Sequence, residues 1–152
     1  MDCPDERYAR RVHISLHADM PTQQEISDFL IKEFPQSRAT VVAVGGKSAT
    51  VRHAVGIQEL RPGGTVSGPV MMTVVDVALY VAILGEIGIV PLTVTTSLNI
   101  NFMRKPAADR ALIGVCKLLK LGKTLAVGEV TIYSEGVDEP VAHAVGTYAI
   151  PR

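Results

Sequence analysis

The sequence is short of charge, and the charges it has cancel. Its 152 residues include 15 basic and 15 acidic side chains, and charged residues make up 20% of the chain, against about 25% in an average domain. No long run of lysine or arginine breaks this balance. Proteins that bind nucleic acid usually present a basic face, so we expect no nucleic-acid partner.

Cysteine is also scarce. Cys3 and Cys116 are the only two, which excludes a disulfide framework, and neither belongs to the Cys-x-x-Cys pair typical of a structural zinc site. The first residues, Met1-Asp2-Cys3-Pro4-Asp5-Glu6, lack the basic start and apolar core of a secretory signal. We therefore expect a cytoplasmic protein with reduced thiols and no metal site.

Apolar residues, in contrast, make up 47% of the chain. That fraction is too high for a disordered protein, and the length fits one domain over residues 1–152. A small chain with so much apolar surface and so few charges does not cover all of that surface by itself. The composition is thus a first indication of a homo-oligomer.

One apolar run, residues 70–90, is long enough to cross a bilayer. However, Asp76 lies inside it, and Gly85, Glu86 and Gly88 follow. A carboxylate within a membrane span costs several kcal/mol or more. We therefore predict a helix that is buried in a soluble core, and no membrane partner.

Local patterns predict the remaining elements. Residues 1–20 read as a polar extension, and residues 22–34 read as a short amphipathic helix that begins with a Thr22–Glu25 capping box and ends before Pro35. Six segments rich in β-branched residues, separated by turn residues, read as strands. Two precede the apolar helix (about residues 69–85) and four follow it: residues 39–44, 49–58, 92–103, 111–121, 124–134 and 141–150.

This order predicts the fold. Strands joined by successive hairpins form an antiparallel sheet, and only a sheet that wraps the helix would bury a segment that is apolar on nearly every face. The fold class is therefore α+β, with an antiparallel sheet wrapped around one long central helix.

Asp76 is the most informative position. A carboxylate two turns into an apolar helix needs hydrogen bonds, a cation or a raised pKa. It is either a structural residue that bonds nearby backbone, or a base or nucleophile made reactive by desolvation. The preceding loop contains Gly63, Gly64 and Gly68, which allow close backbone approach. Because the first amides of a helix favour negative charge, Asp76 could face a substrate held at the helix start, which indicates acyl transfer or hydrolysis.

Three motifs carry a resemblance to a known family. Ser67-Gly68-Pro69 followed by Asp76 resembles the His-Gly-Gly…Asp pattern of hotdog-fold acyl-CoA thioesterases of the phenylacetyl-CoA thioesterase (PaaI-like) type, in which the acid stands eight positions after the first glycine. Residues 98–106 resemble the family's third strand, and Gly122-Lys123 resembles its strand turn. The resemblance covers roughly residues 40–151.

The resemblance implies a hotdog fold and hydrolysis of a small or medium acyl-CoA, with coenzyme A as part of the substrate and no other cofactor. Asp76 would be the base or nucleophile, the Gly68 amide would polarise the thioester carbonyl, and Thr95, or its neighbour Thr96, would orient the attacking water. Family sites are built between two subunits, so a homodimer or a dimer of dimers is implied, in which Thr95 serves the partner's Asp76.

The chain departs from the family at three positions. Ser67 replaces the histidine, Pro69 replaces the second glycine, and Arg61 stands where asparagine is common. The Ser67 hydroxyl is still a donor to a thioester oxygen, whereas Pro69 has no amide to donate. Arg61 is a candidate phosphate ligand, and pairing of Arg61 with Asp76 would weaken that carboxylate as a base.

Other interpretations stay open. Arg104, Lys105 and Lys123 are either solvated or hold the phosphates of coenzyme A. The loss of the family histidine favours a non-catalytic acyl-CoA or acyl-ligand binding protein on the same scaffold. A hotdog hydratase or dehydratase would need a histidine near the helix, and His53 and His143 lie instead in predicted strands.

Overall fold

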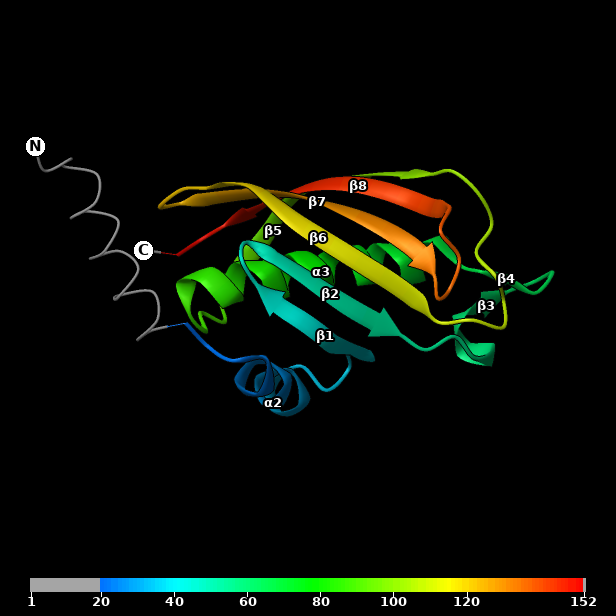
Figure 1. Cartoon of the computed structure of the whole chain (residues 1–152), viewed down its shortest axis with the longest axis horizontal. Coiled ribbons are helices and arrows are strands. Elements are labelled where there is room, and N and C mark those ends of the chain that lie inside the picture. The colour runs from blue at the N-terminus through cyan, green and yellow to red at the C-terminus, as the bar shows by residue number, and fades with distance from the viewer. Residues whose placement is uncertain (1–19, 152) are drawn as a thin grey trace, which may run out of the picture.

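The computed structural model describes residues 20–151, and Figure 1 shows their arrangement. The predicted extension, apart from Met20, lies outside the described residues. In chain order the elements are α2 (Gln23–Glu33), β1 (Ala39–Gly45), β2 (Ser48–His53), the 3-10 helix η1 (Ile57–Glu59), β3 (Leu60–Arg61), β4 (Thr65–Val66), α3 (Gly68–Ile87), β5 (Val94–Phe102), β6 (Leu112–Leu121), β7 (Leu125–Ser134) and β8 (Pro140–Ala149).

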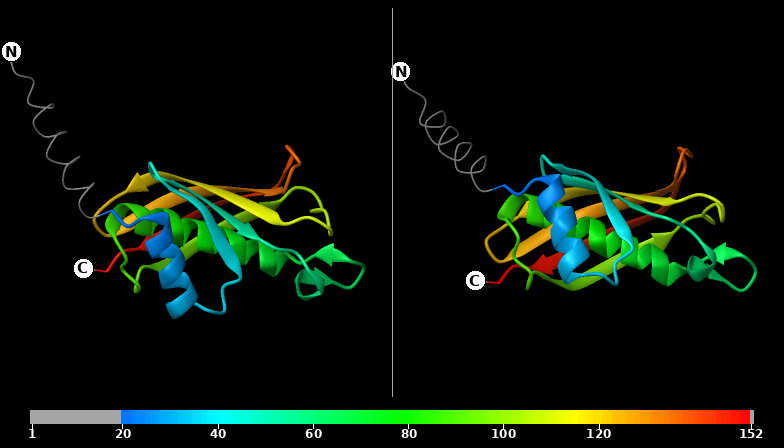
Figure 2. Two further views of the ribbon diagram at one scale, coloured as in Figure 1. Left: turned by 60° about the horizontal axis from the view of Figure 1, so that its bottom comes forward. Right: turned by 90° about the horizontal axis from the view of Figure 1, so that it is seen from below.

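Six strands form one antiparallel sheet in the order β1-β2-β6-β7-β8-β5. The sheet curves around α3, and α2 lies beside α3 and β1, as both views of Figure 2 show. The short β3–β4 ribbon stands at the N-terminal end of α3. The predicted hotdog fold, with an antiparallel sheet wrapped around a long central helix, is confirmed.

Both helices begin as the sequence predicts. The Thr22 Oγ1 accepts the Glu25 N–H at 3.1 Å and the Glu25 Oε1 accepts the Thr22 N–H at 3.2 Å, so the capping box is complete. The Ser67 Oγ accepts the Val70 N–H at 3.4 Å at the start of α3. At its other end α3 runs two residues further than predicted, to Ile87, and Gly88 caps it with a φ of +92°, which favours glycine.

The packing of α3 on the sheet depends on two facing glycines. Gly128 of β7 pairs with Gly146 of β8, and the fully buried Leu79 of α3 lies against both. A Cβ at Gly128 would lie 2.7 Å from the Leu79 Cδ2, and a Cβ at Gly146 would lie 2.5 Å from the Leu79 Cδ1. The glycines therefore let the helix approach the sheet more closely than any other residue type would.

The predicted second strand, residues 49–58, is too long. β2 ends at His53, because His53 pairs with Leu112, the first residue of β6, and the chain then has no neighbouring strand to bond. It turns instead through η1, where the Gly56 N–H donates to the Glu59 Oε2 at 2.9 Å.

The close helix–sheet contact generates a stability prediction. Gly146→Ala should lower the free energy of unfolding by about 1–3 kcal/mol, because the added methyl group overlaps Leu79 in a filled core. In a Leu79→Ala background the same change should cost much less, because the space is then open. Urea unfolding of the four proteins in this cycle measures the difference, and an equal cost in both backgrounds would contradict the assignment.

Candidate active site

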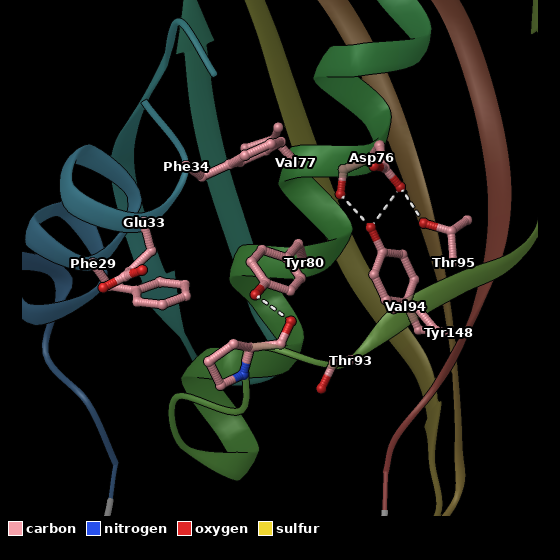
Figure 3. Close-up of a pocket in the computed structure, with 11 residues that line it drawn as sticks. Phe29, Glu33, Phe34, Asp76, Val77, Tyr80, Thr93, Val94, Thr95 and Tyr148 are labelled. Atoms are coloured by element: carbon pink, nitrogen blue, oxygen red, sulfur yellow. Dashed lines mark hydrogen bonds between the residues drawn. The ribbon is translucent and has the colours of Figure 1, made fainter. Parts of the chain in front are cut away.

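The carboxylate of Asp76 is held by two hydroxyl groups. The Thr95 Oγ1 donates to the Asp76 Oδ1 at 2.6 Å, and the Tyr148 OH lies 2.5 Å from the same oxygen (Figure 3). Thr95 of β5 pairs with Tyr148 of β8, so the register of the sheet brings both groups to α3. Neither bond uses the Asp76 Oδ2, which is therefore available to a substrate or a water molecule.

Tyr148 was missed by the sequence analysis. Its hydroxyl also lies 2.9 Å from the backbone O of Asp76, and a phenol has one hydrogen to donate to either oxygen. Burial raises the pKa of Tyr148 well above its usual value, and the negative charge of Asp76 raises it further. Tyr148 is therefore a neutral hydrogen-bond donor at physiological pH.

The two threonines proposed for one role lie differently. Thr95 faces Asp76 of its own chain, whereas the resemblance implied that it serves the partner's Asp76. The Thr96 Oγ1 donates instead to the backbone O of Thr147 at 3.2 Å. Thr96 lies where the register of the β5–β8 pair shifts, because Thr95 pairs with Tyr148 and Ser97 pairs with Thr147. Thr95 thus orients the carboxylate directly.

Two pockets meet at Asp76. The first, of about 500 Å³, lies between α2, α3 and the start of β5, and Phe29, Phe34 and Tyr80 supply much of its wall (Figure 3). The second, of about 410 Å³, opens toward the first turns of α3. Asp76 and Thr95 line both pockets, so the carboxylate stands where an elongated molecule could pass from one to the other.

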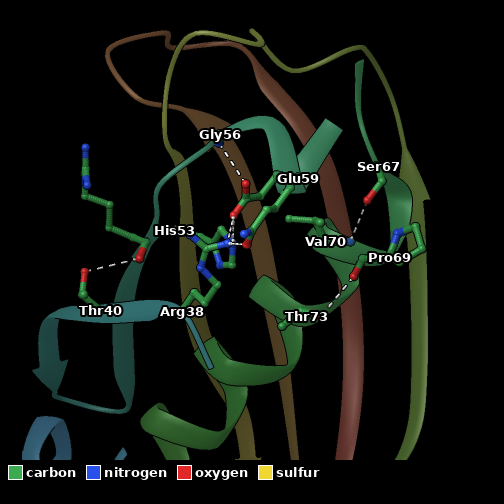
Figure 4. A network of polar contacts seen from close by, with 11 residues as sticks. Arg38, Thr40, His53, Gly56, Glu59, Ser67, Pro69, Val70 and Thr73 are labelled. Atoms are coloured by element: carbon green, nitrogen blue, oxygen red, sulfur yellow. Dashed lines mark hydrogen bonds and ion pairs between the residues drawn. The ribbon is translucent and has the colours of Figure 1, made fainter. Parts of the chain in front are cut away.

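The start of α3 offers one free amide. The Ser67 Oγ is engaged by the Val70 N–H, and Pro69 has no N–H (Figure 4). The Gly68 N–H meets no acceptor among residues 20–151. A Cβ at Gly68 would lie 3.4 Å from the Phe102 ring, so the last residue of β5 covers this glycine.

Asp76 and Gly68 lie far apart within one chain. Eight residues of α-helix span about 12 Å along the axis, which is more than one thioester group and one water molecule bridge. A thioester carbonyl held at the Gly68 amide of one chain is therefore remote from Asp76 of that chain, and the expectation that Asp76 faces a substrate held at the start of its own helix stays a prediction.

The predicted cations are spread over the molecule. Arg61 lies exposed in β3, and no ion pair of the described residues joins it to Asp76. Arg104 and Lys105 follow β5 close to Phe102, and the Arg104 Nη1 lies 3.4 Å from the Glu139 Oε2. Lys123, exposed in the β6–β7 turn, lies at the opposite end of the sheet, because Leu125 pairs with Ala149.

No group of His, Cys, Asp or Glu side chains within residues 20–151 is arranged to hold a metal ion. His53 and His143 lie in β2 and β8, and neither lines a pocket that contains Asp76. Neither histidine of the described residues therefore lies beside the Asp76 carboxylate.

The Tyr148–Asp76 bond generates a prediction about alkaline stability. A pKa raised in the folded state adds stability that is fully present below the unfolded value of about 10 and is lost as pH rises toward the folded value. Above pH 10, the free energy of unfolding should therefore fall more steeply for the wild type than for Tyr148→Phe, by up to about 1.4 kcal/mol per pH unit. Urea unfolding between pH 9 and 11 measures both slopes, and parallel slopes would refute the shift.

Comparisons with known proteins identify the family. The profile of the Thioesterase superfamily matches residues 63–141, whereas a search of curated proteins gives no match. A candidate thioesterase from Silicibacter sp. TM1040 is 43% identical, with a TM-score of 0.80, and the match covers 86% of this chain and 92% of that one.

Two more distant structures share the fold. A mutant of the phenylacetic acid degradation protein PaaI from Thermus thermophilus is 22% identical, with a TM-score of 0.67 and coverage of 78% of this chain and 98% of that one. The protein smu.793 from Streptococcus mutans UA159, bound to acetyl-CoA, is 20% identical, with a TM-score of 0.69 and coverage of 76% and 90%. With the hotdog architecture and the profile match in agreement, this chain belongs to the Thioesterase superfamily.

Proposed function

We propose that the protein is an acyl-CoA thioesterase that hydrolyses a small or medium acyl-CoA, with Asp76 as the base or nucleophile. The observation that carries this proposal is the placement of Asp76, fixed through one oxygen by Thr95 and Tyr148 at the junction of two pockets. Membership of the Thioesterase superfamily supports the reaction, and the acetyl-CoA bound to the Streptococcus mutans protein supports the ligand class.

The free Oδ2 of Asp76 acts on the thioester in either of two ways. As a base it takes a proton from water while the water oxygen bonds to the carbonyl carbon, and the proton passes to the thiolate when the C–S bond breaks. As a nucleophile it bonds to the carbon itself, the C–S bond breaks and the thiolate leaves, which gives an anhydride on Asp76; water then cleaves the anhydride, restores the carboxylate, releases the acid and supplies the proton that the thiolate takes. In both routes Thr95 and Tyr148 keep the carboxylate in one orientation.

The negative charge that develops on the carbonyl oxygen needs a donor. We assign this role to the Gly68 N–H at the positive end of α3, with the Ser67 hydroxyl as a second donor. Because Gly68 is about 12 Å from Asp76 of its own chain, the donor comes from a second copy.

The edge strand β5 fits such a second copy. β6, β7 and β8 alternate buried and outward-facing residues, whereas β5 is largely exposed on both faces. Its apolar residues Val94 and Phe102 are 53% and 50% exposed, and an uncovered edge of this kind pairs readily with another strand. We propose a homodimer, alone or within a dimer of dimers, that pairs the two β5 strands.

Antiparallel pairing of two β5 strands would also complete the site. In each chain Thr95, near the start of β5, contacts Asp76, and Phe102, at its end, covers Gly68. A two-fold axis at the middle of β5 brings the start of one strand to the end of the other. The Asp76 of one copy then lies toward the Gly68 amide of its partner, twice in each dimer.

In this dimer the acyl group and the phosphates of coenzyme A would lie near different groups of the protein. The aromatic pocket of about 500 Å³ would take the acyl group. Arg104 and Lys105 follow Phe102 near the start of α3, where the phosphates of coenzyme A would lie, and Arg61 is the nearest cation on the β3–β4 ribbon. Lys123 lies at the other end of the sheet, so it would have to serve from the partner.

Asp76→Asn tests the proposal directly. Removing a general base typically lowers kcat by about 10²–10⁴-fold, and asparagine preserves the shape of the side chain. Release of free thiol from a panel of acyl-CoAs, followed with a thiol reagent, measures the effect. Equal rates for both proteins would remove Asp76 from the mechanism, and binding of acyl-CoA without hydrolysis by the wild type would favour the non-catalytic binding protein.

Two neighbouring threonines provide a matched pair for the orienting role. Thr95→Val should lower kcat about tenfold, because the carboxylate loses a hydrogen bond of 2.6 Å that is worth roughly 1.5 kcal/mol with a charged acceptor. Thr96→Val removes only a bond to backbone and should leave kcat within about twofold. Steady-state kinetics with one acyl-CoA compare them, and equal losses would contradict the assignment.

A further inference from the structure

A buried acid lies in the segment that joins β2 to α3, outside both pockets. Glu59, the last residue of η1, is 2% exposed. The Arg38 Nη1 lies 2.9 Å from its Oε1, and the Gly56 N–H donates to its Oε2 at 2.9 Å. The His53 Nε2 lies 3.5 Å from Oε1, so three groups surround one carboxylate (Figure 4).

Glu59 and Arg38 are the charged members of this cluster, and together they form an ion pair. Burial raises the pKa of Glu59, but the Gly56 amide, Arg38 and, to a lesser extent, the amide of Glu59 itself and His53 together outweigh it, so the pKa lies below its usual value. Burial lowers the pKa of His53, which is therefore neutral at physiological pH. A buried charge is destabilising unless it is paired and hydrogen-bonded, and this carboxylate is both.

The backbone of Glu59 connects the cluster to the start of α3. The Ser67 N–H donates to the backbone O of Glu59 at 2.9 Å. Between them the chain forms the β3–β4 ribbon, in which Leu60 pairs with Val66. Because Gly68 follows Ser67, only three covalent bonds separate the Ser67 N, which bonds to Glu59, from the Gly68 N, which carries the free hydrogen.

The start of α3 has few groups that could stabilise an oxyanion. The tripeptide Ser67-Gly68-Pro69 lacks the family's histidine and has no amide at Pro69, and the Ser67 Oγ already caps the helix. The Gly68 N–H is the one backbone amide left to meet the developing oxyanion, beside the Ser67 hydroxyl, and such a donor must lie about 2.7–3.1 Å from the oxyanion. A displacement of 1 Å costs up to about 100-fold in rate.

We propose that Glu59 is a positioning residue for the oxyanion donor. Arg38 and Gly56 hold its carboxylate, and this in turn holds the backbone carbonyl of Glu59, which accepts the Ser67 N–H. The Gly68 N–H, on the next peptide, is thereby aimed at the thioester carbonyl oxygen. The proposal rests on the thioesterase function proposed above. Glu59 touches neither substrate nor Asp76, and it acts through the peptide between Ser67 and Gly68.

Glu59→Gln and Glu59→Ala test this role, and Ser134→Ala is the control for a purely structural effect. We expect kcat to fall about 10–100-fold, with KM within about threefold, because the donor serves the transition state more than the bound substrate. Glutamine should retain more activity than alanine, because its Oε1 still accepts the Gly56 N–H. Ser134, also 2% exposed, accepts the Ala107 N–H at 2.9 Å, so its loss should lower the melting temperature and leave kcat unchanged.

A spectroscopic readout separates positioning from stability. An acyl-CoA labelled with ¹³C at the thioester carbonyl is bound to Asp76→Asn, which turns it over slowly, and its infrared carbonyl stretch is recorded. Donation by the Gly68 N–H should move the stretch to lower wavenumber, and adding Glu59→Gln should reverse most of that shift. Adding Ser134→Ala should leave the shift in place.

The two proposals fail in different ways. Wild-type protein that binds acyl-CoA but releases no thiol would refute the thioesterase function, and the carbonyl shift would still test Glu59. An active wild type with an unchanged kcat in Glu59→Gln would overturn the role of Glu59. Two other results would overturn the role of Glu59. One is a loss of activity in Ser134→Ala as large as that in Glu59→Gln, for an equal loss of melting temperature. The other is a carbonyl stretch that does not respond to Glu59→Gln.

Discussion

The fold depends on how closely α3 can approach the sheet. A helix that is apolar on nearly every face has to be covered on nearly every side, and one curved sheet covers it only if the two backbones come close together. Gly128 and Gly146 make this possible, because they leave space that Leu79 fills. The same close approach brings Tyr148, two residues after Gly146 on the same face of β8, to the backbone and carboxylate of Asp76.

Asp76 is a polar residue in an apolar helix, and the structure gives it a specific environment. Thr95 and Tyr148, from two neighbouring strands, both bond its Oδ1. Two donors on one oxygen restrict the rotation of the side chain, so the carboxylate has one preferred orientation before a substrate arrives. A group held in this way needs little reorganisation during a reaction, which is the condition under which electrostatic effects contribute most to catalysis.

Much of the fold could be predicted from the sequence, because its signals are local. The capping box at Thr22, the β-branched runs and the apolar helix each depend on neighbours within a few residues, and Asp76 stood out for the same reason. Tyr148 and Glu59 could not be identified in this way, because no local pattern marks them. Tyr148 lies 72 positions from Asp76 and meets it only through the strand register, and Glu59 directly follows a stretch, residues 49–58, that reads as a strand. The assignment of Thr95 to the partner's Asp76 was carried over from the resemblance, whereas the contact that the structure shows is with Asp76 of the same chain.

Pairing through the exposed strand β5, as proposed, would link the chemistry to the association of two chains. Each chain would contribute its carboxylate to one site and its amide to the other, so a lone chain would hold two incomplete halves. Activity per molecule would then follow the monomer–dimer equilibrium and fall on dilution, even though every chain stayed folded. The lifetime of a working site would be the lifetime of the pair, and the rate at which subunits exchange would limit how long any one site persists.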